Sequence, residues 1–156
     1  MKLRRIISGG QTGADQGGWL AAKAVSLETG GWMPRGFLTE AGPRPEFARL
    51  YGAREHSSDK YPPRTYANVA ESDATIWFGR GDSRGFACTE NATLGAKKPL
   101  FTVLYRDRTP EDVALLIDGF GVVVLNVAGN RESMAPGIQQ RVAEFLVEVV
   151  KALESR

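Results

Sequence analysis

The sequence predicts an α/β fold in which a mostly parallel sheet carries helices on both faces. Strand-like and helix-like patterns alternate along most of the 156 residues, which is typical of βα units in a parallel sheet. Three of the apolar strands run directly into a glycine-bearing loop, and each loop opens a helix. In open parallel sheets such loops gather at the carboxyl edge, where ligands bind.

The first strand, loop and helix open the chain. A β-branched run ends at Ser8 in two glycines, and apolar residues at helical spacing follow over 20–27. Glycine lets the backbone adopt positive φ and approach a ligand closely, and the free N–H groups of a helix start attract phosphate or carboxylate. A tight connection without a ligand is the alternative interpretation. The candidate ligand contacts are Gly9, Gly10, Gln11, Thr12 and Gly13.

The spacing of this loop excludes two familiar phosphate motifs. A P-loop requires Lys followed by Ser or Thr, which residues 9–15 lack, and the G-x-G-x-x-G spacing of the dinucleotide fingerprint is also absent. Asp15 falls in the first turn of the expected helix. A carboxylate there is either a partner of the helix dipole or a contact to a ligand or bound cation.

Composition and charge narrow the class of protein. With 42% hydrophobic and 24% charged residues, the chain is typical of a soluble globular domain, and its length suits one domain over 1–156. A formal net charge of +2 does not favour a nucleic-acid partner. Cys88 and His56 are the only residues of their kinds, so no internal disulfide and no protein-held metal are expected. No signal-peptide core or membrane span is present, and a cytoplasmic location is the expectation.

Residues 28–63 form the least regular stretch. They contain repeated glycine and proline, and only a short strand at 31–33 is expected. A long stretch with so little periodicity is usually a lid or a binding loop. Rings such as Trp32 and Tyr61 are costly to leave in water, so they either fill a satellite core or stack on a planar ligand. We therefore expect a lid-like insertion that packs on the body of the domain.

Two further units follow the same plan as the first. The apolar run 74–78 precedes a glycine-rich turn at 79–85 and a helix that ends before Pro99. The apolar run 122–127 precedes a third glycine-bearing turn and a last helix over 136–153.

Smaller elements connect these units. Thr65 is expected to cap a short helix before the second apolar run, and residues 100–104 form a strand pattern. The segment 109–112, Thr-Pro-Glu-Asp, has the cap, the proline and the acidic residues of a helix start.

Polar side chains near the loops are further candidates. Arg64 is either a guanidinium fork for phosphate, which we favour, or a structural partner of Asp73 or Glu90. Asn126 closes a buried apolar run, and we expect it to face a pocket. Asn68 lies in a helix close to Arg64 and is also a candidate.

The third loop and the lone cysteine leave alternatives open. Gly129 and Arg131 are expected ligand contacts, and Ser133 is either a phosphate contact or a helix cap. Cys88 is either a thiol of lowered pKa beside a glycine loop or, as we favour, a small buried residue.

Taken in order, these motifs resemble the molybdenum carrier family. That family is grouped with the circularly permuted branch of the Rossmann-like SLOG superfamily, which also includes the LOG-type nucleotide phosphoribohydrolases and the DNA-processing protein Smf/DprA. The resemblance implies a Rossmann-like three-layer αβα sandwich. The matching positions are 8–15, 31–34, Tyr61, 64–65, 68–69, 72–75, 125–129, 131–133 and 136–137.

One superfamily motif is matched only in part. LOG-type enzymes have a Pro-Gly-Gly-x-Gly-Thr-x-x-Glu loop, whose backbone binds phosphate and whose Glu works at the ribose. In this chain the paired glycines are missing, and Thr89 and Glu90 are adjacent. The resemblance implies that Gly85 and Thr89 contact the ligand and that Glu90 bonds a sugar hydroxyl, whereas the departure argues against glycosidase activity.

Three functions follow from these expectations. A binding or carrier protein ranks first, because the loops support binding and no catalytic set is complete; its ligand would be a phosphate-bearing nucleotide or a pterin such as molybdenum cofactor. A nucleotide N-glycosidase ranks second, with Glu90 and Asp15 as acid–base candidates. Nucleic-acid binding ranks third. Small Rossmann-like domains commonly self-associate, so a homo-oligomer is expected.

Overall fold

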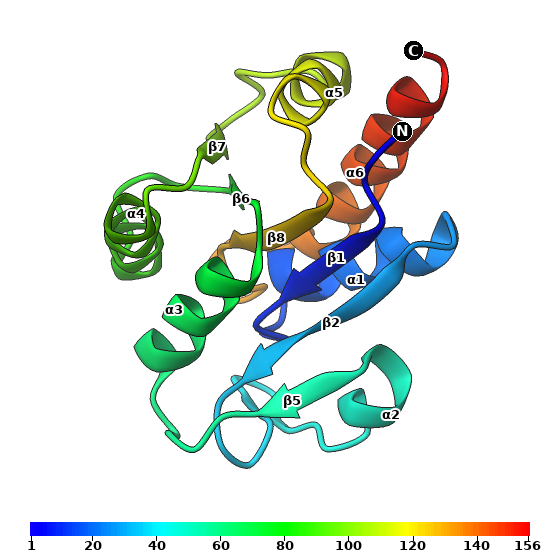
Figure 1. Cartoon of the computed structure of the whole chain (residues 1–156). Coiled ribbons are helices and arrows are strands. Elements are labelled where there is room, and N and C mark those ends of the chain that lie inside the picture. The colour runs from blue at the N-terminus through cyan, green and yellow to red at the C-terminus, as the bar shows by residue number, and fades with distance from the viewer.

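The computed structural model describes residues 1–156 and confirms the α/β fold. Six parallel strands form one central sheet in the order β5-β2-β1-β8-β6-β7 (Figure 1). Their bounds are β1 (Arg5–Ser8), β2 (Glu28–Met33), β5 (Ala53–Glu55), β6 (Ala74–Phe78), β7 (Leu100–Val103) and β8 (Val124–Gly129).

Helices cover both faces of this sheet, as the three-layer sandwich requires. On one face α1 (Ala14–Ala24) packs along α6 (Ile138–Glu154), and α5 (Pro110–Gly119) packs on α6 as well. On the other face α3 (Tyr61–Glu71) packs on α4 (Arg84–Ala96) (Figure 1). The connection from one parallel strand through a helix to the next is right-handed. Connections that run in one direction across the sheet therefore place their helices on one face, and connections that run in the other direction place theirs on the opposite face. None of the helices has the length and apolar composition needed to cross a bilayer.

The main core lies between the sheet and the layer of α1, α5 and α6. Ile6, Ile76 and Leu125 point into it from three strands, and Val142 and Leu146 meet them from α6. These residues explain the strong apolar periodicity of the last helix, because one face of α6 is buried along most of its length.

Residues 28–63 are more regular than the sequence predicts. They supply β2 and β5 to the central sheet, a small hairpin of β3 (Leu38–Thr39) and β4 (Gly42–Pro43), and the short helix α2 (Phe47–Tyr51). The expectation of an irregular insertion is therefore wrong for these elements. It failed because Gly30 and Gly31 break the apolar pattern of β2; a Cβ at Gly31 would lie 2.1 Å from the Ser8 carbonyl oxygen, so the glycine permits close strand packing.

The aromatic residues of this region form a satellite core in part. Trp19 of α1 stacks on Tyr51 at 4.6 Å between ring centroids and meets Phe47 edge-on at 5.5 Å. Met33 lies in the same cluster. The rings of α2 therefore stabilise the fold and are not available to a ligand, while Tyr61 has a different position, described below.

Two helix starts test the capping predictions. Thr109 and Asp112 form the expected capping box, in which the Thr109 hydroxyl accepts from the Asp112 N–H at 3.1 Å and the Asp112 carboxylate accepts from the Thr109 N–H at 2.9 Å. Thr65 is not a cap, because α3 begins at Tyr61. Its hydroxyl instead donates to the Tyr61 carbonyl one turn earlier at 3.2 Å.

A substitution at Gly129 tests the contact between β8 and its neighbours. A Cβ there would lie 2.2 Å from the Phe78 carbonyl oxygen and 2.5 Å from the Ala14 Cβ. We expect Gly129→Ala to lower the free energy of unfolding by about 1–3 kcal/mol, as overpacking does. The control is Gly119→Ala at the end of α5, where nothing lies within 4 Å. Equal denaturation midpoints for wild type and Gly129→Ala would contradict the close packing.

Candidate functional site

The three glycine-bearing loops meet at the carboxyl edge of the sheet, and Asn130 ties them together. Its carbonyl accepts from the Ala14 N–H at 3.1 Å, its N–H donates to the Phe78 carbonyl at 3.0 Å, and its side-chain oxygen accepts from the Arg80 N–H at 2.8 Å. Sequence reasoning missed this residue. Its position in the sequence could have indicated it, because it is a polar residue directly after the glycine that ends a buried strand.

A cleft of about 350 Å³ opens at this edge between the amino-terminal turns of α3 and α4. We call it the α3–α4 cleft. All three loops contribute to it, which agrees with the expectation that they line one crevice. Its lining residues are Gln11, Asp15, Tyr61, Pro62, Arg64, Thr65, Trp77, Arg84, Gly85, Cys88, Thr89, Ala128, Gly129 and Arg131.

Arg64 lies across the first glycine loop at the base of this cleft. A Cβ at Gly9 would come within 2.4 Å of its guanidinium carbon, so the glycine makes room for the arginine. The guanidinium lies 3.8 Å from the Asp15 carboxylate, and its Nη1 donates to the Thr65 hydroxyl at 3.0 Å. The alternative interpretation, a pairing with Asp73 or Glu90, is therefore wrong, because the partner is Asp15. The Nε atom is buried without a partner, and an unsatisfied buried donor of this kind costs about 1–3 kcal/mol.

Asp15 is a buried carboxyl group with an unusual titration. Burial raises its pKa from 3.8 to about 6, against the opposing charge of Arg64 and the backbone N–H groups of Gln11 and Gly9. Its Oδ2 accepts from the Gln11 N–H at 3.2 Å. A carboxyl group that titrates this close to neutrality can hold or release a proton under ordinary conditions. Asp15 lines the α3–α4 cleft and lies 3.8 Å from the Arg64 guanidinium.

Aromatic rings form part of the cleft wall. The Tyr61 ring lies near two guanidinium groups, 5.3 Å from that of Arg64 and 6.0 Å from that of Arg131. Trp77 lines the cleft from β6, and its indole N–H donates to the Arg80 carbonyl at 3.1 Å. Trp77 and Arg84 were not identified from the sequence. Trp77 belongs to an apolar strand, and in the loop that contains Arg84 only the glycines were considered as a signal.

The glycines of the first loop contact the protein's own chain. Gly9, Gly10 and Gly13 do not line the α3–α4 cleft. Gly10 and Gly13 adopt φ of 74° and 84°. A Cβ would lie 2.8 Å from Met33 at the first and 2.5 Å from the Asn130 carbonyl oxygen at the second. These glycines therefore permit close packing within the protein and lie outside the lining of the α3–α4 cleft.

Thr12 and Ser133 already hold a carboxylate. Glu40, from the β3–β4 hairpin, accepts from both hydroxyl groups and from the Ser133 N–H, the last at 3.1 Å. Its own N–H donates to the Gln11 side chain at 2.8 Å. Burial opposes ionisation of Glu40, but the hydrogen bonds from Ser133 and Thr12 prevail and lower its pKa. The two hydroxyl groups expected to bind a ligand anion therefore already bind the Glu40 carboxylate of the protein itself. Ser133 is not a helix cap, since Gly137 precedes α6.

Two asparagines, Asn68 and Asn126, make hydrogen bonds that connect elements of the fold. The Asn68 side chain accepts from the Trp32 N–H at 2.8 Å and donates to the Trp32 carbonyl at 3.0 Å, which fastens α3 to β2. Asn126 donates to the Thr75 hydroxyl at 3.1 Å inside the sheet. Asn126 does not line the α3–α4 cleft, and its buried side chain bonds to the neighbouring strand instead.

The remaining candidates lie on α4. Gly85 and Thr89 line the cleft, whereas Glu90 is exposed on the helix and does not. The cleft therefore contains a single carboxyl group, that of Asp15. Burial raises the pKa of the half-buried Cys88 thiol, so the interpretation of a lowered pKa is wrong. No group of three or more His, Cys, Asp or Glu side chains is arranged to hold a metal ion.

The titration of Asp15 predicts a specific pH dependence of stability. Because its pKa is higher in the folded protein than the ordinary value of 3.8, protonation favours the folded state. Its contribution is present below about pH 4 and is lost as the pH rises through about 6. We expect a loss on the order of 3 kcal/mol over this interval. Urea unfolding at a series of pH values measures it, and Asp15→Asn should flatten this part of the profile; an unchanged slope in the variant would contradict the assignment.

Comparison with known proteins places the chain in a family. Residues 6–150 match the model of the circularly permutated YpsA SLOG family. The fold is similar to the crystal structure of a candidate molybdenum carrier protein from Syntrophus aciditrophicus SB, with a TM-score of 0.83 and 34% sequence identity, covering 97% of this chain and 95% of that one. No functionally curated protein matches the chain. The chain belongs to the circularly permutated YpsA SLOG family.

Proposed function

We propose that this protein binds, as a carrier, a small phosphate-bearing molecule with a planar ring, a nucleotide or a phosphorylated pterin, in the α3–α4 cleft. One observation carries the proposal. Arg64, Arg84 and Arg131 line the same cleft, and Asp15 supplies the only carboxyl group there. A lining with this excess of positive charge attracts an anion.

The arginines and rings suit the two parts of such a ligand. Guanidinium groups bind phosphate through paired hydrogen bonds, and Arg64 has an Nε donor without a partner. Tyr61, which is partly exposed, offers ring surface for stacking of a base or pterin. The volume of about 350 Å³ falls within the range of about 300–1,000 Å³ for small-molecule sites.

Molybdenum cofactor is the most specific candidate ligand. The crystallised relative is named as a candidate molybdenum carrier, and the cofactor is a pterin that bears a phosphate. The three arginines suit the phosphate, and the Tyr61 ring suits the pterin. Because no cluster of metal-ligating side chains is present, the metal would be held by the cofactor's own dithiolene sulfurs.

Hydrolysis of a nucleotide glycosidic bond is less well supported. Glu90 lies outside the cleft, so Asp15 is left as the only acid–base candidate among the expected residues. The usual chemistry of glycoside hydrolysis employs two carboxyl groups that flank the scissile bond. This arrangement favours binding over turnover.

A blocked cleft tests the proposal. Gly85 is exposed in the first turn of α4, and a Cβ there would point at the Trp77 ring from 3.3 Å. Gly85→Leu should therefore fill the cleft without breaking the helix. Gly95→Leu is the matched control on the same helix, because nothing lies within 4 Å of Gly95.

Thermal unfolding would be measured with phosphate, AMP, GMP, ADP-ribose, NAD and a pterin phosphate. A ligand at a hundred times its Kd adds about 2.7 kcal/mol, a shift of several degrees in Tm. We expect at least one compound to stabilise wild type and Gly95→Leu but not Gly85→Leu. Release of free base from that compound would assign a hydrolase instead of a carrier. No shift with any phosphate compound would contradict the proposal.

A further inference from the structure

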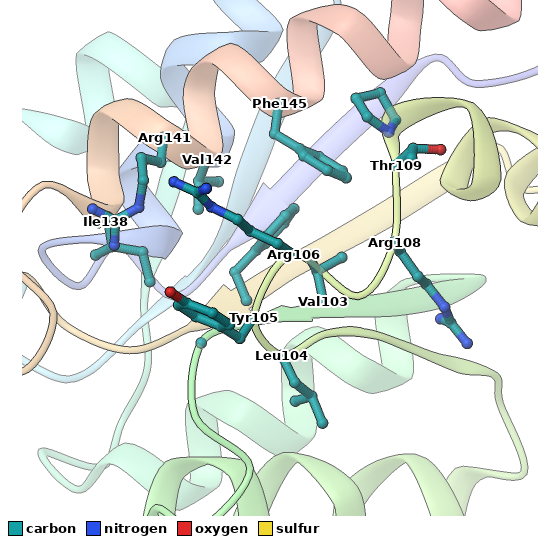
Figure 2. Close-up of a pocket in the computed structure, with 13 residues that line it drawn as sticks. Val103, Leu104, Tyr105, Arg106, Arg108, Thr109, Ile138, Arg141, Val142 and Phe145 are labelled. Carbon is teal, nitrogen blue, oxygen red and sulfur yellow. The ribbon is translucent and has the colours of Figure 1, made fainter.

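A second and larger hollow lies on the opposite face of the sheet. Successive residues of a strand point to opposite faces, so Trp77 lines the α3–α4 cleft while Phe78 lines this hollow. Its volume is about 610 Å³. The walls come from the segment after β7, the start of α5 and the first turns of α6 (Figure 2). We call it the α6 hollow.

The floor of the α6 hollow is apolar and partly aromatic. Ile138 and Val142 of α6 and Val103 of β7 are buried there. Phe78 and Phe145 meet edge-to-face, with ring centroids 5.4 Å apart and an interplanar angle of 78°. Aromatic rings favour this geometry with further rings. The floor can therefore receive the flat apolar body of a ligand.

The rim carries positive charge and no negative charge. Arg106, Arg108 and Arg141 line the hollow, and no Asp or Glu does. Arg106 and Arg108 take part in none of the protein's ion pairs. The Arg141 side chain donates only to the Pro136 carbonyl, at 3.2 Å. In Figure 2, Arg106 extends over the hollow toward the α6 side, whereas Arg108 points away from it.

The backbone holds Arg106 in this position at an energetic cost. Its φ is +49°, a left-handed conformation that non-glycine residues rarely adopt. The turn around it is closed by the Asp107 carboxylate, which accepts from the Leu104 N–H at 3.0 Å. The same turn presents Tyr105, which is 86% exposed. Strained residues of this kind gather at binding sites, where the surrounding structure supports them.

We propose that the α6 hollow is a second ligand site, for a small aromatic molecule that carries one acidic group. The ring system would pack on the partly exposed Phe145, which Phe78 supports edge-on, and the acidic group would meet Arg106 and Arg141. The concave shape and the volume favour a small molecule. The positive charge comes from the guanidinium groups, because the Glu132 carboxylate already accepts from the N–H groups of Gly137 and Gln139 at the start of α6.

The test uses two fluorescent probes with related aromatic bodies. 8-Anilinonaphthalene-1-sulfonate carries a negative charge, and N-phenyl-1-naphthylamine carries none. We expect the sulfonate to bind wild type saturably at a single site. The double variant Arg106→Gln/Arg141→Gln should weaken this binding about tenfold or more, as loss of charged hydrogen bonds does, and should change the affinity for the neutral probe by less than about threefold.

Matched variants separate this site from the rest of the protein. Arg4→Gln/Arg49→Gln removes two exposed arginines elsewhere and should leave the affinity for the sulfonate unchanged. Gly85→Leu should also leave it unchanged, which distinguishes the α6 hollow from the α3–α4 cleft. Urea midpoints would verify that the variants remain folded.

Three results would overturn the proposal. The first is sulfonate binding that the Arg106→Gln/Arg141→Gln variant does not weaken. The second is an equal loss of both probes in that variant, which would show a purely apolar surface. The third is loss of the sulfonate site as the protein dimerises, detected by light scattering at increasing concentration, because a second copy of the chain would then cover the hollow.

Discussion

The fold depends on the hydrogen bonds of Asn130, which hold three separate loops at one edge of the sheet. Its backbone joins the end of β6 to the start of α1, and its side chain fixes the second glycine loop at Arg80. Gly79 and Gly129 permit these approaches, since a Cβ at Gly79 would lie 2.2 Å from the Asn130 side-chain oxygen. The loops that Asn130 joins line the α3–α4 cleft, and the α6 hollow lies on the opposite face of the sheet.

The two sides of the first loop differ in whether their hydrogen-bond donors already have a negatively charged partner. Toward the β3–β4 hairpin, Glu40 already occupies the hydroxyl donors of Thr12 and Ser133. Toward α3 and α4, the Arg64 guanidinium has only Asp15, at 3.8 Å, and the Thr65 hydroxyl as partners. A ligand anion therefore finds unsatisfied donors on the second side alone. This difference supports the α3–α4 cleft as the proposed binding site.

Local sequence patterns predicted the larger features, and long-range contacts decided the rest. Alternating strand and helix patterns with glycine turns determine the α/β class and place the loops, because each is a feature of a few neighbouring residues. Only the second half of β2 was predicted, as a strand at 31–33, because the glycines that allow its close contact with β1 interrupt the apolar pattern of the strand. Likewise, no local signal shows that Glu40 satisfies Ser133 or that Arg64 pairs with Asp15.

The most direct test of the account is an NMR titration of the ¹⁵N-labelled protein with AMP and with a pterin phosphate. If the α3–α4 cleft binds the ligand, the largest amide shift changes will fall at Gly85, Cys88, Gly129 and Arg131, with smaller changes on the opposite face of the sheet. Changes concentrated at residues 103–110 and 138–145 would place the phosphate compound in the α6 hollow and contradict the assignment of the cleft.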